Sequence, residues 1–198
     1  MTNIYKNISI PAFVAATLLA TTTPSYAYDF SYNYVEGSYA SSTDDSLGID
    51  IDSTIIGLFG SFEVSESVAI TAGYAAADYD DIDVDATNLQ IGATLHTSVG
   101  QMTDVYLNLS LLKVDYDLPP PFADEDDSGF GIIAGVRHAI NDKVELEAAY
   151  LHVDIFDETS NQIGLGARFY FTSSASFGLS YATGDDVDTF AGDIRVQF

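Results

Sequence analysis

Apolar and polar residues alternate along residues 190–198. One set of alternate positions is apolar and the other is charged or amide: Phe190, Ile194, Val196 and Phe198 against Asp193, Arg195 and Gln197. Because successive side chains of a strand point to opposite faces, this pattern predicts a strand with one apolar and one charged face. A strand that turns its apolar face to lipid and its charged face to a lumen is typical of a membrane barrel.

The same period of two recurs in nine earlier segments. They cover residues 30–40, 49–64, 68–77, 86–97, 103–116, 129–140, 144–154, 161–171 and 175–183. Together the segments predict an all-β fold, a single antiparallel up-and-down transmembrane β-barrel of ten strands. Eight strands is the alternative, if the short segments at one terminus are not strands.

The segment 103–116 breaks the simple alternation. Apolar residues occupy odd positions as far as Leu111, and then Leu112, Val114 and Tyr116 bring apolar side chains to the even positions. A β-bulge, or a strand that leaves the bilayer, would each explain this change. The sequence alone does not choose between the two.

Short and long connections between the segments alternate. Those after even-numbered segments are tight, for example Ser65-Glu66-Ser67 and Asn141-Asp142-Lys143, whereas those after odd-numbered segments are longer or more acidic. An even number of strands places both termini on the same side of the membrane. In outer-membrane barrels the tight turns face the periplasm, so the acidic connections are expected to face outwards.

The first 27 residues have the features of a signal peptide. Lys6 precedes a short apolar run at 10–20, and the small residues Ser25 and Ala27 suit cleavage after Ala27. The expected domains are therefore a signal peptide, 1–27, and an outer-membrane barrel, 28–198. No later stretch holds 18 consecutive apolar residues, so no transmembrane helix is expected.

The chain is strongly acidic, with 30 Asp and Glu against 6 Lys and Arg and a formal net charge of −24. This charge excludes a nucleic-acid binder. Each of the five outer connections carries at least three acids. We expect no cofactor, but oxygen-rich loops next to lipopolysaccharide phosphates suit weak divalent cation binding. The alternative is a solvated, repulsive surface. The stretch from Asp78 to Asp83 lacks the Gly and the final Glu of an EF-hand loop.

A second group of charges falls on the face that points into the lumen. Its members are Glu36, Arg137, Glu145, Glu147, Arg168, Asp193 and Arg195. A three-residue turn at 141–143 would place Ile140 opposite Val144 and Arg137 opposite Glu147. Buried charges require partners, so these residues are expected to fill and fix a narrow lumen. A gated ion path is the alternative.

Candidates for catalysis are few. His152 and Asp154 lie on one face of the segment 144–154 at its outer end. The ten-stranded omptin proteases also keep an acid and a His at the outer rim, but this chain is too short for the raised strands of that fold. The sequence also offers no set of a Ser, a His and an acidic residue that would indicate a lipid hydrolase.

The signal peptide, the rhythm of strands and turns, and the last residues Ile194, Val196 and Phe198 resemble those of small bacterial outer-membrane β-barrel proteins of the OmpA-like and OmpX-like kind. The resemblance implies export through the periplasm to the outer membrane. It also implies that Ile194, Val196 and Phe198 form the signal read by the barrel-assembly machinery. The resemblance identifies no catalytic residue in this chain.

We therefore predict a non-enzymatic outer-membrane barrel with acidic extracellular loops and a structural or surface-interaction role. Its expected partners are outer-membrane lipid, lipopolysaccharide and the barrel-assembly machinery. The alternatives are a narrow porin, and a surface protease or lipid-modifying barrel enzyme. The sequence leaves the ligand and the oligomeric state open.

Overall fold

A computed structural model describes residues 30–45, 50–79 and 84–198. The expected signal peptide, residues 1–27, lies outside the described residues, as do Ile49 and the acidic residues between 80 and 83. Ten strands follow one another: β1 (Tyr34–Asp44), β2 (Ile51–Ser65), β3 (Val68–Tyr79), β4 (Val84–Ser98), β5 (Thr103–Asp117), β6 (Glu125–Asn141), β7 (Val144–Ile155), β8 (Glu158–Tyr170), β9 (Ala175–Gly184) and β10 (Val187–Gln197).

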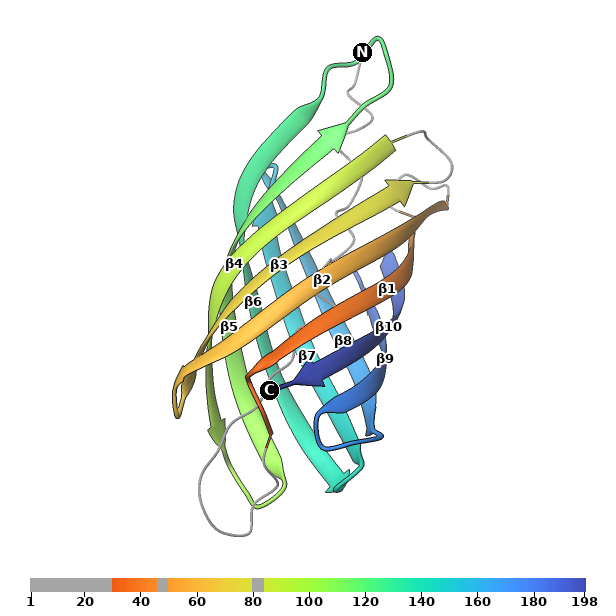
Figure 1. The fold of residues 1–198 in the computed structure, drawn as a ribbon. Coiled ribbons are helices and arrows are strands. Elements are labelled where there is room, and N and C mark those ends of the chain that lie inside the picture. The colour runs from red at the N-terminus through yellow and green to blue at the C-terminus, as the bar shows by residue number, and fades with distance from the viewer. Residues whose placement is uncertain (1–29, 46–49, 80–83) are drawn as a thin grey trace.

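The strands form one closed antiparallel barrel in which each strand pairs with its sequence neighbours and β1 pairs with β10 (Figure 1). The closing seam runs from the pair Tyr34 and Gln197 to the pair Asp44 and Val187. Closure satisfies the backbone groups that an open edge would leave unpaired in lipid. The predicted ten-stranded barrel is thus confirmed, and the eight-stranded alternative is wrong.

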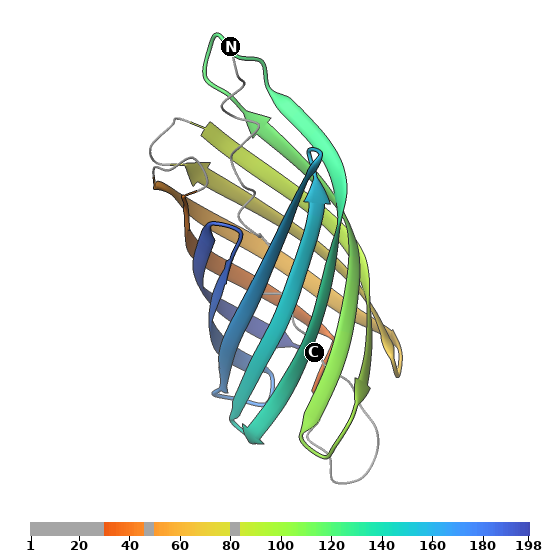
Figure 2. The ribbon, with the colours of Figure 1, turned by 180° about the vertical axis from the view of Figure 1, so that it is seen from behind.

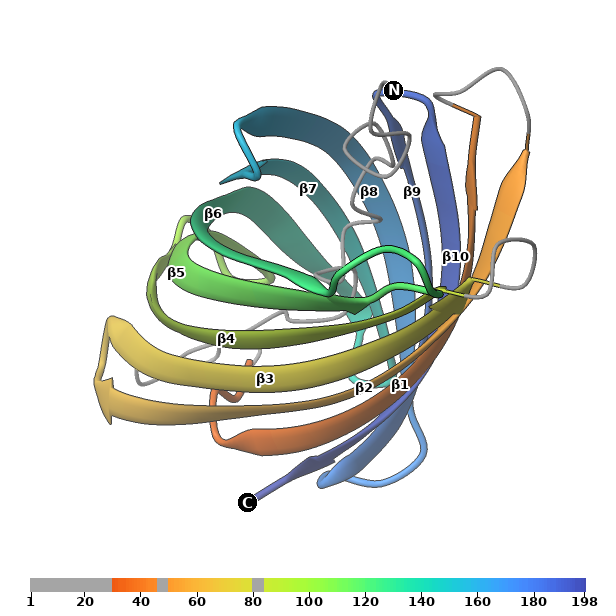
Figure 3. The same cartoon turned by 90° about the horizontal axis from the view of Figure 1, so that it is seen from above.

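The outer surface carries the large apolar side chains predicted to face lipid. Examples from three parts of the chain are Leu58, Leu165 and Ile194, whose exposed fractions are 59%, 61% and 58%. Seen from above, the strands enclose one lumen (Figure 3). Along each strand, the side chains on the face toward this lumen include the buried ones. No helix in the described ranges is long and apolar enough to cross a membrane.

The wall of the barrel differs in height around its circumference. β6 has 17 residues and β9 has 10, against the roughly ten that a tilted strand needs to cross a bilayer. The β5–β6 hairpin therefore rises well above the β9–β10 hairpin, which is the lowest part of the outer rim (Figure 2).

Two outer connections are shorter than expected. Phe156 and Asp157 join β7 to β8, and Asp185 and Asp186 join β9 to β10, all with positive φ between 46° and 67°. Paired positive φ values are the geometry of tight two-residue hairpins. These connections are therefore tight turns and not the longer loops that were expected.

Candidate functional site

The seven predicted lumen charges all lie in the half of the barrel that holds the start of β1 and the end of β10, which we call the inner half. They come from β1 (Glu36), β6 (Arg137), β7 (Glu145 and Glu147), β8 (Arg168) and β10 (Asp193 and Arg195). Glu36, Arg137 and Arg195 are fully buried. The structure thus brings together side chains that are separated by up to 159 residues in the sequence.

Glu36 is the centre of the larger ion network. Its Oε2 atom accepts hydrogen bonds from Arg195 Nε at 2.7 Å and from Arg168 Nη2 at 3.0 Å. Arg168 Nη1 in turn lies 2.6 Å from Asp193 Oδ1. β8 and β1 are not neighbours in the barrel, so the Arg168–Glu36 pair crosses the lumen. Opposite charges alternate along this chain, which offsets the cost of burying them.

A second ion pair joins Arg137 to Glu145, with Arg137 Nε 2.6 Å from Glu145 Oε1. Tyr170 donates a hydrogen bond to the other oxygen of Glu145 at 2.9 Å. Arg137 does lie opposite Glu147 in the strand register, as expected, but its salt bridge goes to Glu145.

The hydrogen bond to Glu147 comes from Tyr106 Oη, at 2.7 Å. The register next to the β6–β7 turn differs from the prediction. Asn141, and not Ile140, pairs with Val144, because the pairing shifts by one residue between Ala139 and Asn141. Such a β-bulge leaves Ile140 without an opposite residue.

Residues 30–33, which precede β1, lie inside the inner end of the lumen. They were predicted to form the start of the first strand, but β1 begins at Tyr34. Asn33 holds the segment in place, since its carbonyl accepts the Phe198 N–H at 3.0 Å and its Oδ1 accepts the Glu63 N–H at 3.0 Å. The segment therefore packs against the charged cluster and does not extend the sheet.

The aromatic rings of this segment and of Tyr34 contact the charged cluster directly. The guanidinium carbon of Arg137 lies 5.0 Å from the centre of the Phe30 ring, and that of Arg195 lies 3.9 Å from the centre of the Tyr34 ring. Tyr32 stacks on His96 with 3.7 Å between ring centres. Sequence reasoning missed this arrangement, although Phe30, Tyr32 and Tyr34 share the phase of Glu36.

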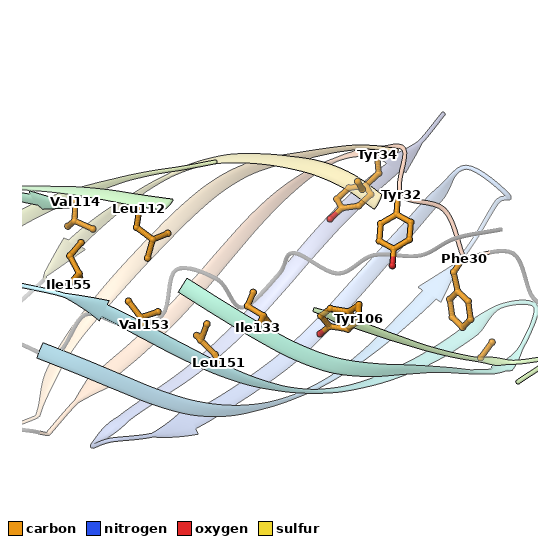
Figure 4. Packing of buried hydrophobic residues seen from close by; sticks show 12 residues of the cluster. Phe30, Tyr32, Tyr34, Tyr106, Leu112, Val114, Ile133, Leu151, Val153 and Ile155 are labelled. Carbon is orange, nitrogen blue, oxygen red and sulfur yellow. The ribbon is translucent and has the colours of Figure 1, made fainter. Parts of the chain in front are cut away.

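The outer half of the lumen, toward the acidic connections, holds most of the buried aliphatic side chains, together with buried polar residues such as Asp44 and Gln162. Figure 4 shows the aromatic residues at one end of a buried cluster and aliphatic side chains at the other, among them Leu112, Val114, Leu151, Val153 and Ile155. A second buried cluster includes Ile51, Ile55, Phe59, Tyr79 and Val84. Both clusters come from positions that point into the barrel.

This apolar lining explains the change of pattern in segment 103–116. β5 pairs with β4 and β6 through Leu112 and Val114 without any shift of register, so the β-bulge is excluded. Leu111 faces outwards with 68% of its surface exposed, whereas Leu112 is 4% exposed in the lumen. Both faces of the strand are apolar here because Leu112 and Val114 belong to the buried apolar cluster inside the barrel.

The acidic residues of the outer rim are mostly dispersed over the connections. Two of them, Asp115 and Asp126, are held together by the exposed Lys113, whose Nζ atom lies 2.5 Å from Asp115 Oδ1 and 3.4 Å from Asp126 Oδ2. Asp185 accepts a hydrogen bond from the side chain of Asn161 at 3.1 Å. In residues 30–45, 50–79 and 84–198, no group of three or more His, Asp or Glu is arranged to hold a metal ion.

The two candidate catalytic residues do not bind each other through the His152 ring. His152 Nδ1 lies 2.9 Å from Asn161 Oδ1, and Tyr150 donates to the same oxygen at 2.6 Å. His152 and Asp154 alternate with Leu151, Val153 and Ile155, which are buried in the lumen, so they lie on the outward face of β7.

The three residues expected to guide assembly lie on the outward face at the inner end of the barrel. Ile194, Val196 and Phe198 are exposed by 58%, 53% and 71%. Phe198 follows the last residue of β10, and the chain terminus lies beside the start of β1 (Figure 1).

A closed ten-stranded barrel with an apolar exterior and a buried charged lumen is the architecture of a transmembrane β-barrel. The family model described as outer membrane protein beta-barrel domain matches residues 12–182, which is well over half of the chain. The chain therefore belongs to this family, and its location is the bacterial outer membrane. No curated protein matches the sequence significantly.

Solved structures of other outer-membrane barrels share the fold. An outer-membrane channel of Pseudomonas putida F1 has 10% identity and a TM-score of 0.52, with 96% of this chain and 100% of that chain covered. The β domain of the Bordetella autotransporter BrkA has 13% identity and a TM-score of 0.50, over 83% and 98%. Neisserial surface protein A has 15% identity and a TM-score of 0.49, over 85% and 98%. At identities this low, the first two similarities show a shared fold alone.

Proposed function

We propose that the protein is a non-conducting, non-enzymatic outer-membrane barrel whose role is structural or concerns interactions at the cell surface. The main support for this proposal is the filled inner lumen, where Glu36, Arg137 and Arg195 are fully buried and form hydrogen-bonded ion pairs. A ten-stranded barrel has a narrow interior that side chains largely fill, in contrast to the aqueous channels of barrels with about 16 strands.

Two independent layers support a closed lumen. The ion network joins β1, β8 and β10 across the inner half. The aromatic segment 30–33 lies in the same region, and Tyr32 donates a hydrogen bond to Asp104 Oδ2 at 3.3 Å. An ion that crosses the barrel would have to separate buried charge pairs and displace packed rings. Each of these steps is costly in a low-dielectric interior.

The outer rim is the surface through which the protein meets its partners. Its acidic residues give the chain most of its net charge of −24. Lipopolysaccharide phosphates are also anionic, so divalent cations shared between the two surfaces are the chemistry that would join them. The proposed partners are therefore outer-membrane lipid and lipopolysaccharide, through weakly bound Ca²⁺ or Mg²⁺.

Planar-bilayer recordings test the closed lumen. The purified barrel is expected to give no stable single-channel steps, whereas removal of residues 30–33 together with Arg195→Ala should give brief openings. The matched control is Arg195→Ala alone, which leaves the aromatic segment in place. A stable large conductance from the unaltered protein would favour the narrow porin instead.

We further propose that Ile194, Val196 and Phe198 are the residues read by the assembly machinery. The support is their alignment on one exposed face at the inner end. Phe198→Ala should lower the amount of heat-modifiable barrel in the outer membrane. Phe190→Ala, on the same face but nearer the outer rim, is the control. Equal membrane levels for both variants would contradict the proposal.

A further inference from the structure

A narrow cavity of about 60 Å³ lies in the lumen against β7, β8, β9 and β10. Arg168 and Asp193 of the ion network, together with Glu145, line its inner end. The lumen-facing residues of β8 and β9 beside it are small: Gly164, Gly166, Gly178, Ser180 and Ala182. A water molecule needs about 10 to 15 Å³ in such a cavity, so there is room for several waters or a short organic chain.

The two glycines of β8 are not required by close packing of the backbone. A Cβ atom added at Gly164 would lie 3.8 Å from its nearest neighbours, and one at Gly166 would lie 3.6 Å from the Leu179 carbonyl oxygen. Both distances are ordinary van der Waals contacts. The absence of side chains here therefore leaves space in the lumen, and does not relieve a steric clash.

Gln162 points into this cavity with its hydrogen-bonding groups unused. The residue is 2% exposed, and neither Oε1 nor Nε2 has a partner among the described residues. A buried amide without partners costs roughly 1 to 3 kcal/mol, so its persistence requires an explanation. A molecule that occupies the cavity would supply the missing donors and acceptors.

At the inner end of the cavity lies Glu147, which faces Arg137 across the β6–β7 ladder but has no salt bridge of its own among the described residues. The lumen cluster holds four acids, Glu36, Glu145, Glu147 and Asp193, against three Arg, so one negative charge of the cluster is left without a matching Arg. The nearby basic groups are engaged elsewhere, Arg137 with Glu145 and Arg168 with Glu36 and Asp193. Glu147 accepts a hydrogen bond from Tyr106 and forms no salt bridge within the described part of the chain. A half-buried carboxylate without a salt bridge favours a positively charged partner.

The two polar ends are suitably spaced for one short ligand. Glu147 pairs with Gly166 and Leu151 pairs with Gln162, so the two levels are four residues apart on β7. At about 3.3 Å per residue they are separated by roughly 13 Å along the strand, before side-chain lengths are subtracted. Between them lie the glycines of β8 and the apolar side chains of Ala149, Leu151 and Ile133.

The outer end of the cavity adjoins the lowest part of the barrel rim. β8 pairs with β9 only from Ile163 onwards, so Gln162 lies directly above the last pair. The β9–β10 hairpin at this point carries Asp185, Asp186 and Asp188. Acidic residues at the mouth of a site raise the local concentration of cations.

From these contacts we propose that the cavity binds a small organic cation, a short alkyl chain with one or two ammonium groups. One ammonium pairs with the Glu147 carboxylate, the alkyl part lies along Gly164 and Gly166, and the Gln162 amide hydrogen-bonds the far end. The inference does not depend on the closed lumen proposed above, since the cavity lies beside the ion network, whose residues Arg168 and Asp193 line its inner end.

NMR titration of the ¹⁵N-labelled barrel in micelles tests the site, with 1,4-diaminobutane as the probe. Saturable shifts are expected at the Gln162 side-chain amide and at the Gly164 and Gly166 backbone amides. Butyrate at the same concentration should not produce them, and sodium chloride at matched ionic strength controls for screening. Shifts confined to outer acidic residues and linear in concentration would overturn the proposal.

Three variants sharpen this test. Glu147→Gln and Gln162→Met should each weaken binding about tenfold, as expected for loss of one hydrogen bond to a charged or buried group. Gly164→Val should abolish binding because its side chain occupies the cavity. Glu66→Gln, at an exposed periplasmic turn, is the control and should bind normally.

Heat-modifiable migration establishes that each variant is folded. If Glu147→Gln does not fold, Gly164→Val and Gln162→Met carry the test, because neither removes a charge. Unchanged affinity in both of these variants would refute the site.

Discussion

The two halves of the lumen are held together by different physical interactions. In the inner half, buried charges pair across the barrel, as Glu36 does with Arg195 and Arg168. In the outer half, Leu112, Val114 and their neighbours form an apolar core. The lumen of a membrane barrel is often treated as uniformly polar, but here lipid-like packing continues inside the wall. The difference predicts that the halves respond differently to substitution.

The largest effect is expected from breaking the inner ion network. Arg195→Met leaves Glu36 buried with only Arg168 as a cation, and should lower the free energy of unfolding by about 3 to 5 kcal/mol. Urea titration of the barrel in lipid vesicles measures this loss. The double variant Glu36→Gln with Arg195→Met should recover part of it. A single variant as stable as the unaltered protein would contradict the account of the inner half.

Adjacent residues of β5 test the outer half. Leu112→Ala creates a cavity in the apolar lumen and should cost about 3 kcal/mol. Leu111→Ala, on the lipid face one residue earlier, should cost clearly less because lipid fills the space. Urea unfolding of the two variants under the same conditions provides the comparison. If Leu111→Ala were the more destabilising, the inward placement of Leu112 would be wrong.

A smaller effect is expected from the aromatic contact to Arg195 within the inner half. Tyr34→Leu keeps an apolar side chain but removes the ring beneath Arg195, and should cost about 1 kcal/mol. Tyr74→Leu, on the lipid face of β3, is the matched control because no Arg lies over its ring in the described structure. Equal losses in the two variants would show that the cation–π contact adds nothing.

The smallest effect is expected at the exposed rim. Lys113→Met removes the salt bridges to Asp115 and Asp126, which solvent and salt already screen. Its unfolding curve should overlay that of the unaltered protein at physiological salt. A loss comparable to that of Arg195→Met would mean that exposure does not separate the two kinds of ion pair.

Much of the fold was predictable because strand alternation is a local property. Each predicted segment corresponds to one of β1 to β10, and outward positions such as Leu58 and Ile194 were assigned to the correct face. A slip of one residue would turn every side chain to the other face, so the pattern fixes the phase wherever only one face is apolar. The same argument fails at Leu111 and Leu112, where both faces are apolar.

For the candidate site, the sequence predicted which charged residues face the lumen but not which of them form ion pairs. Sequence pattern placed Glu36, Arg137 and Arg168 on the lumen face. It indicated Glu147 as the residue opposite Arg137, but not that Glu145 forms the ion pair. A side chain as long as Arg reaches diagonal neighbours, so the choice depends on strand tilt and on Tyr106, which donates to Glu147 from β5.

The sequence by itself thus determined the alternating segments, the lipid-facing positions of most of them and the acidity of the connections, because period and charge are local properties of the chain. It left ten and eight strands as alternatives. The tertiary structure alone decided which charges meet across the lumen, that residues 30–33 lie inside it, and that small residues on β8 and β9 leave a cavity next to Gln162. These features depend on closure of the sheet, which brings residues far apart in sequence to the same depth in one narrow space.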